Sequence, residues 1–156
     1  MLLFSSLPSH GEDNCWVKSG QKYQIDPWLL YSIGQVESDL NPMAVNNNKN
    51  STDAGLMQIN TNFWLPELKK YQIGKSDLFD PCTSIDVGAW VLKQSFEIFG
   101  YSWEGVGAYN AGTSLSPEAY SRRRYYSNKV KKRYELNTNF RVDEISSSQL
   151  SIEKEK

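Results

Sequence analysis

The chain has 156 residues, which is enough for one domain with its own hydrophobic core. Its 17 lysine and arginine residues nearly balance 18 aspartate and glutamate residues, and the formal net charge is −1. This balance excludes a global electrostatic attraction to nucleic acid or to an anionic membrane surface. No stretch is apolar for long enough to span a bilayer. The five tryptophans and nine tyrosines fit either a well-filled core or a cleft for flat, amphipathic ligands such as sugar rings.

The first eleven residues resemble the end of an export signal. A short apolar run at 2–4 precedes small residues at Ser9 and Gly11, which suit the two positions that a signal peptidase recognises. The basic segment that normally begins such a signal is missing. We therefore expect residues 1–11 to be the remnant of a signal peptide and the mature protein to lie in the periplasm. A frayed terminus is the alternative.

Export would leave the mature chain without histidine, because the only histidine is His10. This excludes Ser-His-Asp and Cys-His catalysis and the usual histidine-bearing zinc sites. We accordingly expect no metal and no cofactor, and the chemistry is left to carboxylates, tyrosine, lysine or serine. The two cysteines, Cys15 and Cys82, are an even number in an exported chain and predict one disulfide. Two buried free thiols are the alternative.

Helical signals recur along the rest of the chain. Asp26 is a typical N-cap residue, and Pro27 is a typical first residue of a helix. The apolar residues of 84–99 follow one another at steps of four and three, which places them on one helical face. Thr83 with Asp86 resembles a capping box at the start of that helix. We predict helices at about 14–24, 27–38, 63–71, 84–99, 103–110 and 117–134.

Other segments lack these signals. Residues 41–53 are rich in asparagine and are predicted to form a loop, and 54–60 are apolar but too few to assign by their period. The tail at 138–156 is polar with mixed charge, and we expect it to be disordered. The expected fold is therefore mostly α, a single compact helical domain over 12–137 with little or no sheet.

Glu37 is the first candidate for chemistry. It lies at the end of the second helix, four residues after Ile33 and seven after Leu30, and its carboxyl group therefore shares their apolar face. Apolar surroundings raise the pKa of a carboxyl group, as a general acid needs near neutral pH. Gly34, one turn earlier, leaves space for a substrate or for a packed neighbour. On spacing alone, a surface glutamate at a helix end is the competing interpretation.

Four short motifs in a fixed order carry a family resemblance. They are Glu37-Ser38, Gly55-Leu56-Met57-Gln58-Ile59-Asn60, Ala108-Tyr109-Asn110-Ala111-Gly112, and Arg124-Tyr125-Tyr126 followed by Val130. They resemble the signatures of family 1 (SLT-type) lytic transglycosylases, over a stretch from about Cys15 to Tyr134. The resemblance implies a lysozyme-like fold of the α+β type.

The same resemblance implies a reaction and a set of residue roles. Members of the family cleave peptidoglycan between N-acetylmuramic acid and N-acetylglucosamine without water and leave a 1,6-anhydro end. Glu37 would be the acid for the glycosidic oxygen and then the base for the muramyl 6-hydroxyl, which attacks C1. Ser38 would orient Glu37 or contact the substrate, and Tyr126 would form a hydrogen bond near Glu37. The expected substrate-binding residues are Ser38, Gly55, Met57, Gln58, Ala108, Tyr109, Asn110 and Tyr126.

Some of these residues have a structural alternative. Met57 also fits a plain core position, and Ala108 also fits packing between helices. Gln58 and Asn110 have more polar capacity than a core accommodates, and this favours the site for both.

A narrower group shares further features. The small size, Cys15, Asp80-Pro81-Cys82, and Trp103-Glu104-Gly105-Val106-Gly107 resemble the specialised lytic transglycosylases of type III and type IV secretion and conjugation systems. Within this group, the chain resembles the EtgA-like enzymes of type III secretion. It implies local opening of the wall for an assembling apparatus. The expected partners are glycan strands and a periplasmic component of that apparatus, and we expect a monomer that does not bind nucleic acid.

Asp53 departs from the family pattern. Ser51-Thr52-Asp53-Ala54-Gly55 resembles the Ser-Thr-Asp-x-Gly motif of C-type lysozymes, in which the aspartate is the second catalytic carboxylate, whereas many family 1 lytic transglycosylases have no acid there. We therefore predict that Asp53 is catalytic and lies ionised in the cleft opposite Glu37. The alternative is a local loop cap, because aspartate readily bonds its own backbone.

Three functions remain open at this stage. The first is a lytic transglycosylase, and the second is a hydrolytic muramidase that uses Glu37 and Asp53. The third is a non-catalytic glycan-binding assembly factor.

The basic run at 122–133 fits a solvated helix face, and it also fits attraction of the peptide carboxylates of peptidoglycan or of an acidic partner.

Overall fold

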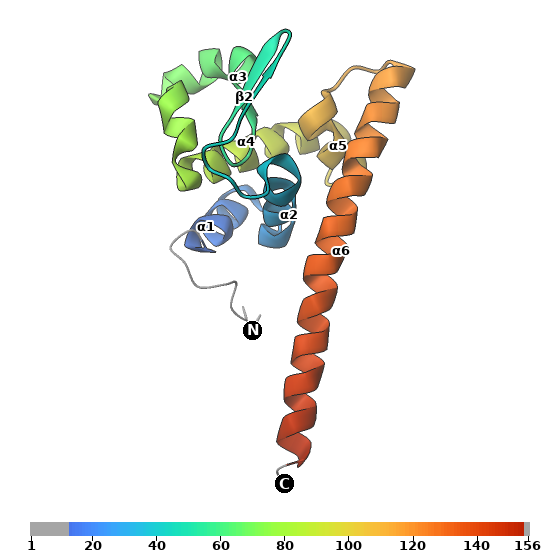
Figure 1. Cartoon of the computed structure of the whole chain (residues 1–156). Coiled ribbons are helices and arrows are strands. Elements are labelled where there is room, and N and C mark those ends of the chain that lie inside the picture. Colours follow the sequence, from blue (N-terminus) through green and yellow to red (C-terminus); the bar gives the residue numbers. More distant parts are fainter. Residues whose placement is uncertain (1–12, 155–156) are drawn as a thin grey trace.

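A computed structural model describes the backbone of residues 13–154, and the expected signal-peptide remnant at 1–11 lies outside this range. The described chain is mostly helical, as predicted, with one small sheet (Figure 1). Among these residues, no helix has both the length and the apolar character to cross a membrane. The α-helices are α1 (Asp13–Tyr23), α2 (Pro27–Ser38), α3 (Thr61–Leu68), α4 (Pro81–Phe99), α5 (Trp103–Ala111) and α6 (Pro117–Lys154), with 3₁₀ helices η1 (Lys69–Tyr71) and η2 (Lys75–Phe79).

Two helices begin with the same Asp-Pro pair. The Asp26 carboxylate accepts a hydrogen bond from the Trp28 amide at 2.9 Å at the start of α2, which confirms the predicted cap. The start predicted for the fourth helix is wrong. The Asp80 carboxylate caps α4 by accepting from the Thr83 amide at 2.8 Å, and α4 therefore starts at Pro81 rather than at 84.

The segment predicted as a loop at 41–53 contains most of a three-stranded antiparallel sheet. Strands β1 (Val45–Asn48), β2 (Ser51–Ala54) and β3 (Ile59–Asn60) follow one another in the sheet. The prediction failed because every residue of β1 is exposed, and no alternation of apolar and polar residues marks it as a strand.

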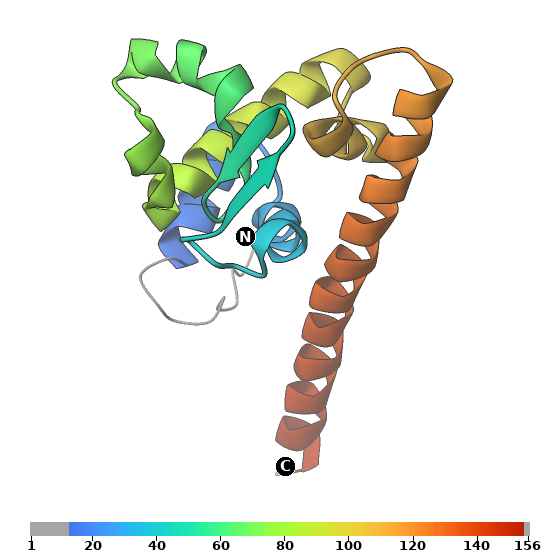
Figure 2. The same cartoon turned by 45° about the horizontal axis from the view of Figure 1, so that its top comes forward.

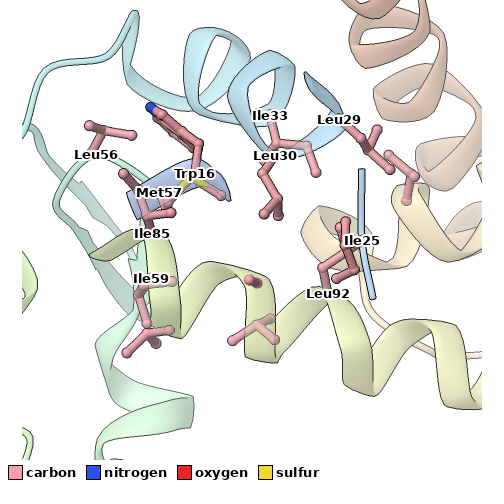
Figure 3. Close-up of a cluster of buried hydrophobic side chains, with 14 of the residues drawn as sticks. Trp16, Ile25, Leu29, Leu30, Ile33, Leu56, Met57, Ile59, Ile85 and Leu92 are labelled. Atoms are coloured by element: carbon pink, nitrogen blue, oxygen red, sulfur yellow. The ribbon is translucent and has the colours of Figure 1, made fainter. Parts of the chain in front are cut away.

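The core lies between α1, α2, α4 and the chain around the sheet (Figure 3). Leu30 and Ile33 of α2 are fully buried, as is Leu92 of α4. At Gly34, an added Cβ would lie within 2.9–3.2 Å of the side chains of Trp16, Leu56 and Leu40. The space at this glycine is therefore filled by packed neighbours and not by substrate.

A disulfide joins Cys15 to Cys82, which confirms the predicted pair. It links the N-terminal turn of α1 to the first turn of α4, across 67 positions of sequence. The disulfide therefore fixes α1 against α4, which contributes buried residues to the core.

Helix α6 is longer than the sequence predicted. It continues through Lys154 instead of ending near Tyr134, and the disordered tail expected at 138–156 is helical as far as that residue. Pro117 is the last proline or glycine in the chain, and no helix breaker follows it. The Asn137 amide still bonds α2, through Ser32 and Gln35 at 2.9 Å each, and the later part extends beyond the other elements (Figures 1 and 2).

The basic run on α6 is not uniformly solvated. Arg123 is 2% exposed, and its guanidinium donates to the carbonyl oxygens of Gly112 (3.2 Å) and Ser114 (2.7 Å) and pairs with Glu104 at 3.3 Å. Arg124, which the sequence motif singled out, is exposed. The buried face of this helix therefore includes Arg123, Tyr126 and Val130, at steps of three and four, with Ala119 and Ser127 also buried.

Candidate active site

A cleft of about 790 Å³ brings together residues from α2, the sheet, α3, α4, α5 and the loop that follows α5. Glu37, on the last turn of α2, and Asp53, on β2, both line it. The cleft therefore unites the two carboxyl groups that the sequence singled out, although sixteen positions separate them in the chain.

Glu37 is held by a single phenol. The Tyr126 hydroxyl donates a hydrogen bond to Glu37 Oε1 at 2.5 Å. Burial raises the pKa of Glu37 to about 7, the Tyr126 hydrogen bond opposes the rise, and the negative charge of Asp53 adds to it. The positive charge of Lys129 lowers the same pKa. Near neutral pH, Glu37 can therefore both release and take up a proton.

Two tyrosine rings stack on each other close to Glu37. Tyr109 of α5 and Tyr126 of α6 stack with ring centroids 6.5 Å apart and planes 19° apart. The Tyr109 hydroxyl donates to the Met57 carbonyl oxygen at 2.6 Å. Burial raises the pKa of both phenols well above the usual value, and they therefore remain neutral hydrogen-bond donors.

Asp53 lies on β2, within the hairpin. Its Oδ2 accepts a hydrogen bond from the Asn48 amide group of β1 at 3.3 Å. The strand itself is anchored to α3, because the Thr52 amide donates to Asn62 Oδ1 and the Thr61 hydroxyl donates to the Thr52 carbonyl oxygen. Partial burial raises the pKa of Asp53 above the ordinary aspartate value. The environment is therefore less polar than the neighbouring Asn, Ser and Thr residues suggested.

Four of the expected substrate-binding residues line the cleft: Gln58, Ala108, Tyr109 and Asn110. Gln58 is buried, and its amide group is already used within the protein. It donates to the carbonyl oxygens of Ala44 (3.1 Å) and Gly55 (2.9 Å) and accepts from Asn46 (2.8 Å). Asn110 is exposed at the cleft and is free to meet a ligand on its solvent side.

Ser38 and Met57 lie outside the cleft lining. The Ser38 hydroxyl donates to the Leu56 carbonyl oxygen at 2.7 Å and accepts from the Asn41 amide at 3.1 Å. It therefore ties the end of α2 to the turn before β3. The Met57 side chain is fully buried and packs where a Cβ at Gly88 of α4 would lie. The burial of Met57 agrees with its alternative interpretation as a core residue, and the hydrogen bonds of Ser38 give it a structural role at the end of α2.

Gly55 is also away from the cleft lining, and its backbone explains why a glycine stands there. Its φ is +80°, and an added Cβ would lie 2.0 Å from the carbonyl oxygen of Leu78. A close backbone approach to η2 therefore accounts for the glycine at this position.

Gly55→Ala is expected to lower the free energy of unfolding by about 2 kcal/mol, because it adds both left-handed strain and a clash. Chemical denaturation would measure this loss. Gly100→Ala is the matched control, since Gly100 has φ +72° but nothing within 4 Å of an added Cβ. Equal losses in the two variants would show that the close approach to Leu78 contributes nothing.

Several lining residues were not found from the sequence. Phe63 and Trp64 of α3 line one side, and Phe63 is 68% exposed. Their rings meet edge to face, and Trp64 meets Trp90 of α4 in the same way. The high aromatic content was the available signal, but it does not say which rings face a cleft. The α4 periodicity marked the buried face and left Gln94 and Glu97, which also line the cleft, unassigned.

Comparison with known proteins places the chain in a family. The family model of the Transglycosylase SLT domain matches residues 14–134. Invasion protein IagB of Salmonella typhimurium is 46% identical over 123 residues, which cover 78% of this chain and 75% of that protein. Protein IpgF of Shigella flexneri is 38% identical over 135 residues, covering 85% of this chain and 87% of that protein.

A solved structure agrees with the fold. An inactive mutant of the lytic transglycosylase Slt from Pseudomonas aeruginosa superimposes with a TM-score of 0.65 and 20% sequence identity. The match covers 83% of this chain and 24% of the much longer Slt chain. With the family match over most of its length, the chain belongs to the Transglycosylase SLT domain family, the peptidoglycan lytic transglycosylases.

Proposed function

We propose that this enzyme cleaves the bond between N-acetylmuramic acid and N-acetylglucosamine without water and leaves 1,6-anhydro ends. The observation that carries the proposal is Glu37, a carboxyl group in the cleft whose pKa is about 7 and whose one oxygen accepts from Tyr126. A group with this pKa is suited to act first as an acid and then as a base at neutral pH. The catalytic domain spans 12–137.

The proposed reaction needs only Glu37 to move a proton. Neutral Glu37 donates its proton to the glycosidic oxygen, and the bond from that oxygen to C1 of the muramyl sugar breaks. The resulting carboxylate takes the proton of the muramyl 6-hydroxyl while the oxygen of that hydroxyl forms a bond to C1. Glu37 ends neutral, no water is consumed, and the next strand meets the same protonation state.

Asp53 is proposed as an electrostatic partner. Positive charge develops at C1 while the glycosidic bond breaks, and a fixed carboxylate in the same cleft stabilises it. The position of Asp53 in the cleft with Glu37 supports this role. The same pair also favours a second candidate, a hydrolytic muramidase in which water attacks C1.

Relatives suggest where the enzyme acts. Two of the similar proteins carry the names invasion protein IagB and IpgF, from Salmonella and Shigella. With the resemblance to enzymes of type III secretion, this supports a periplasmic enzyme that opens the wall locally for a secretion apparatus. We expect the enzyme to act as a monomer. A periplasmic component of that apparatus is the proposed protein partner.

Mass spectrometry of the muropeptides released from purified peptidoglycan tests the chemistry. We expect ends that lack one molecule of water relative to hydrolysed ends. Products that carry the full water would establish the muramidase. Release of nothing by a folded protein would instead support the glycan-binding assembly factor.

A further inference from the structure

The negative charge of the cleft does not complement the charge of its proposed substrate. The charged residues that line it are Glu37, Asp53 and Glu97, and the described lining contains no lysine or arginine. The proposed substrate is itself anionic, because the peptide stems on muramyl residues carry free carboxylates. An acidic cleft that binds an anionic strand needs a positive group where a stem leaves the cleft.

Lys129 of α6 is placed to supply that charge. It lies one turn after Tyr126, and residues three apart on a helix are surface neighbours with Cβ atoms about 5–6 Å apart. The Tyr126 hydroxyl bonds Glu37, and Lys129 therefore lies one turn of α6 from the residue that contacts Glu37, next to the cleft lining and not within it. The positive charge of Lys129 lowers the pKa of Glu37, which agrees with this position.

The surroundings of Lys129 leave it open to a ligand. Its side chain is exposed, and Nζ lies 5.2 Å from the centre of the Tyr125 ring, which is itself 71% exposed. An ammonium group over an exposed aromatic ring offers a carboxylate a positive partner and offers the adjoining peptide an apolar face.

Three of the neighbouring cations of α6 make contacts elsewhere, whereas Arg122, Lys132 and Arg133 are exposed. Arg123 is buried and bonds the loop after α5, and Arg124 lies over the Tyr120 ring. Lys131 lies over the Trp103 ring, at the start of α5. Two positions from Lys129, it faces another side of the helix. Lys131 is therefore a matched control: the same residue type on the same helix, away from the Glu37 end.

We propose that Lys129 and Tyr125 bind a carboxylate of the peptide stem on a muramyl residue held beside Glu37. The enzyme then selects glycan strands with charged stems over strands whose stems are neutral. This inference rests on the proposed function, because it takes the glycan strand as the ligand of the cleft.

Paired substrates test the proposal. One is a soluble, uncrosslinked glycan strand with free stem carboxylates, and the other is the same strand after its carboxyl groups are converted to methylamides with carbodiimide and methylamine. The measured quantity is the ratio of kcat/KM for the free strand to kcat/KM for the amidated strand. We expect wild type to prefer the free strand by about tenfold, mainly through KM, as one charge-assisted contact allows.

Lys129→Gln should bring this ratio close to one, whereas Lys129→Arg and Lys131→Gln should keep the wild-type ratio. Because Lys129 is exposed, the wild-type ratio should also fall as salt is added. The ratio cancels effects on Glu37 that are common to both strands. A ratio of one in wild type, or a wild-type ratio in Lys129→Gln, would overturn the proposal. Failure of the proposed function looks different: neither strand would yield anhydro ends.

Discussion

Glu37→Gln is expected to lower the rate of glycan cleavage by about 100- to 10,000-fold, the usual contribution of general acid–base catalysis. The amide has nearly the same shape as the carboxyl group and can still accept the hydrogen bond from Tyr126, but it cannot donate and retrieve a proton. Release of muropeptides by the purified variant measures the loss. Glu118→Gln is the matched control, since Glu118 is exposed in the first turn of α6, away from the cleft.

The pH dependence gives this prediction a second measurement. Glu37 must begin protonated, and its pKa is about 7, which predicts that wild-type activity falls as pH rises through about 7. Burial raises this pKa from 4.5 to about 7, and the folded state therefore favours the protonated form. The free energy of unfolding accordingly falls as pH rises from about 4.5 to about 7. Glu37→Gln should therefore unfold at the same or a higher temperature than wild type at pH 8. Near-wild-type activity in such a folded variant would refute the assignment of Glu37.

Asp53→Asn is expected to lower turnover by about 100-fold, comparable to the loss of one preorganised electrostatic group, and by less than Glu37→Gln. The asparagine oxygen can still accept from Asn48, and the hairpin should therefore keep its geometry. The product should stay anhydro, because Asp53 stabilises charge and delivers no water. Steady-state kinetics and mass spectrometry of the products together measure both effects.

The control for this variant removes a carboxylate that lies close to Glu37 in sequence but outside the cleft. Asp39 is exposed at the end of α2 with a φ of +53°, a conformation that asparagine tolerates, and Asp39→Asn should cleave at the wild-type rate. Because ionised Asp53 is required, wild-type activity should also fall at acidic pH, from above the ordinary aspartate pKa, since burial raises the pKa of Asp53. Cleavage by Asp53→Asn at the wild-type rate would make Asp53 a structural residue.

Local sequence determined most of the helices, and the family resemblance of the motifs indicated the chemistry. The Asp26-Pro27 start of α2 needs only one capping side chain and a fixed proline φ, and both are properties of adjacent residues. The position of Glu37 on an apolar face also followed from helical spacing, and its raised pKa agrees with that face. The disulfide followed from the number of cysteines, because two cysteines allow one pairing.

Only the tertiary structure decided which motif residues face the cleft. Met57 and Gln58 are adjacent in the same motif, yet Met57 is buried against α4 and Gln58 lines the cleft while it bonds the backbone around it. The hairpin that carries Asp53 was missed for a related reason: β1 is exposed along its whole length and is defined by pairing with β2, not by a pattern of its own. Likewise, neighbouring residues of α6 differ in burial, because α2 and α5 cover one face of the helix and leave the other to solvent. Burial depends on what packs against a residue from distant parts of the chain, and sequence spacing alone does not contain that information.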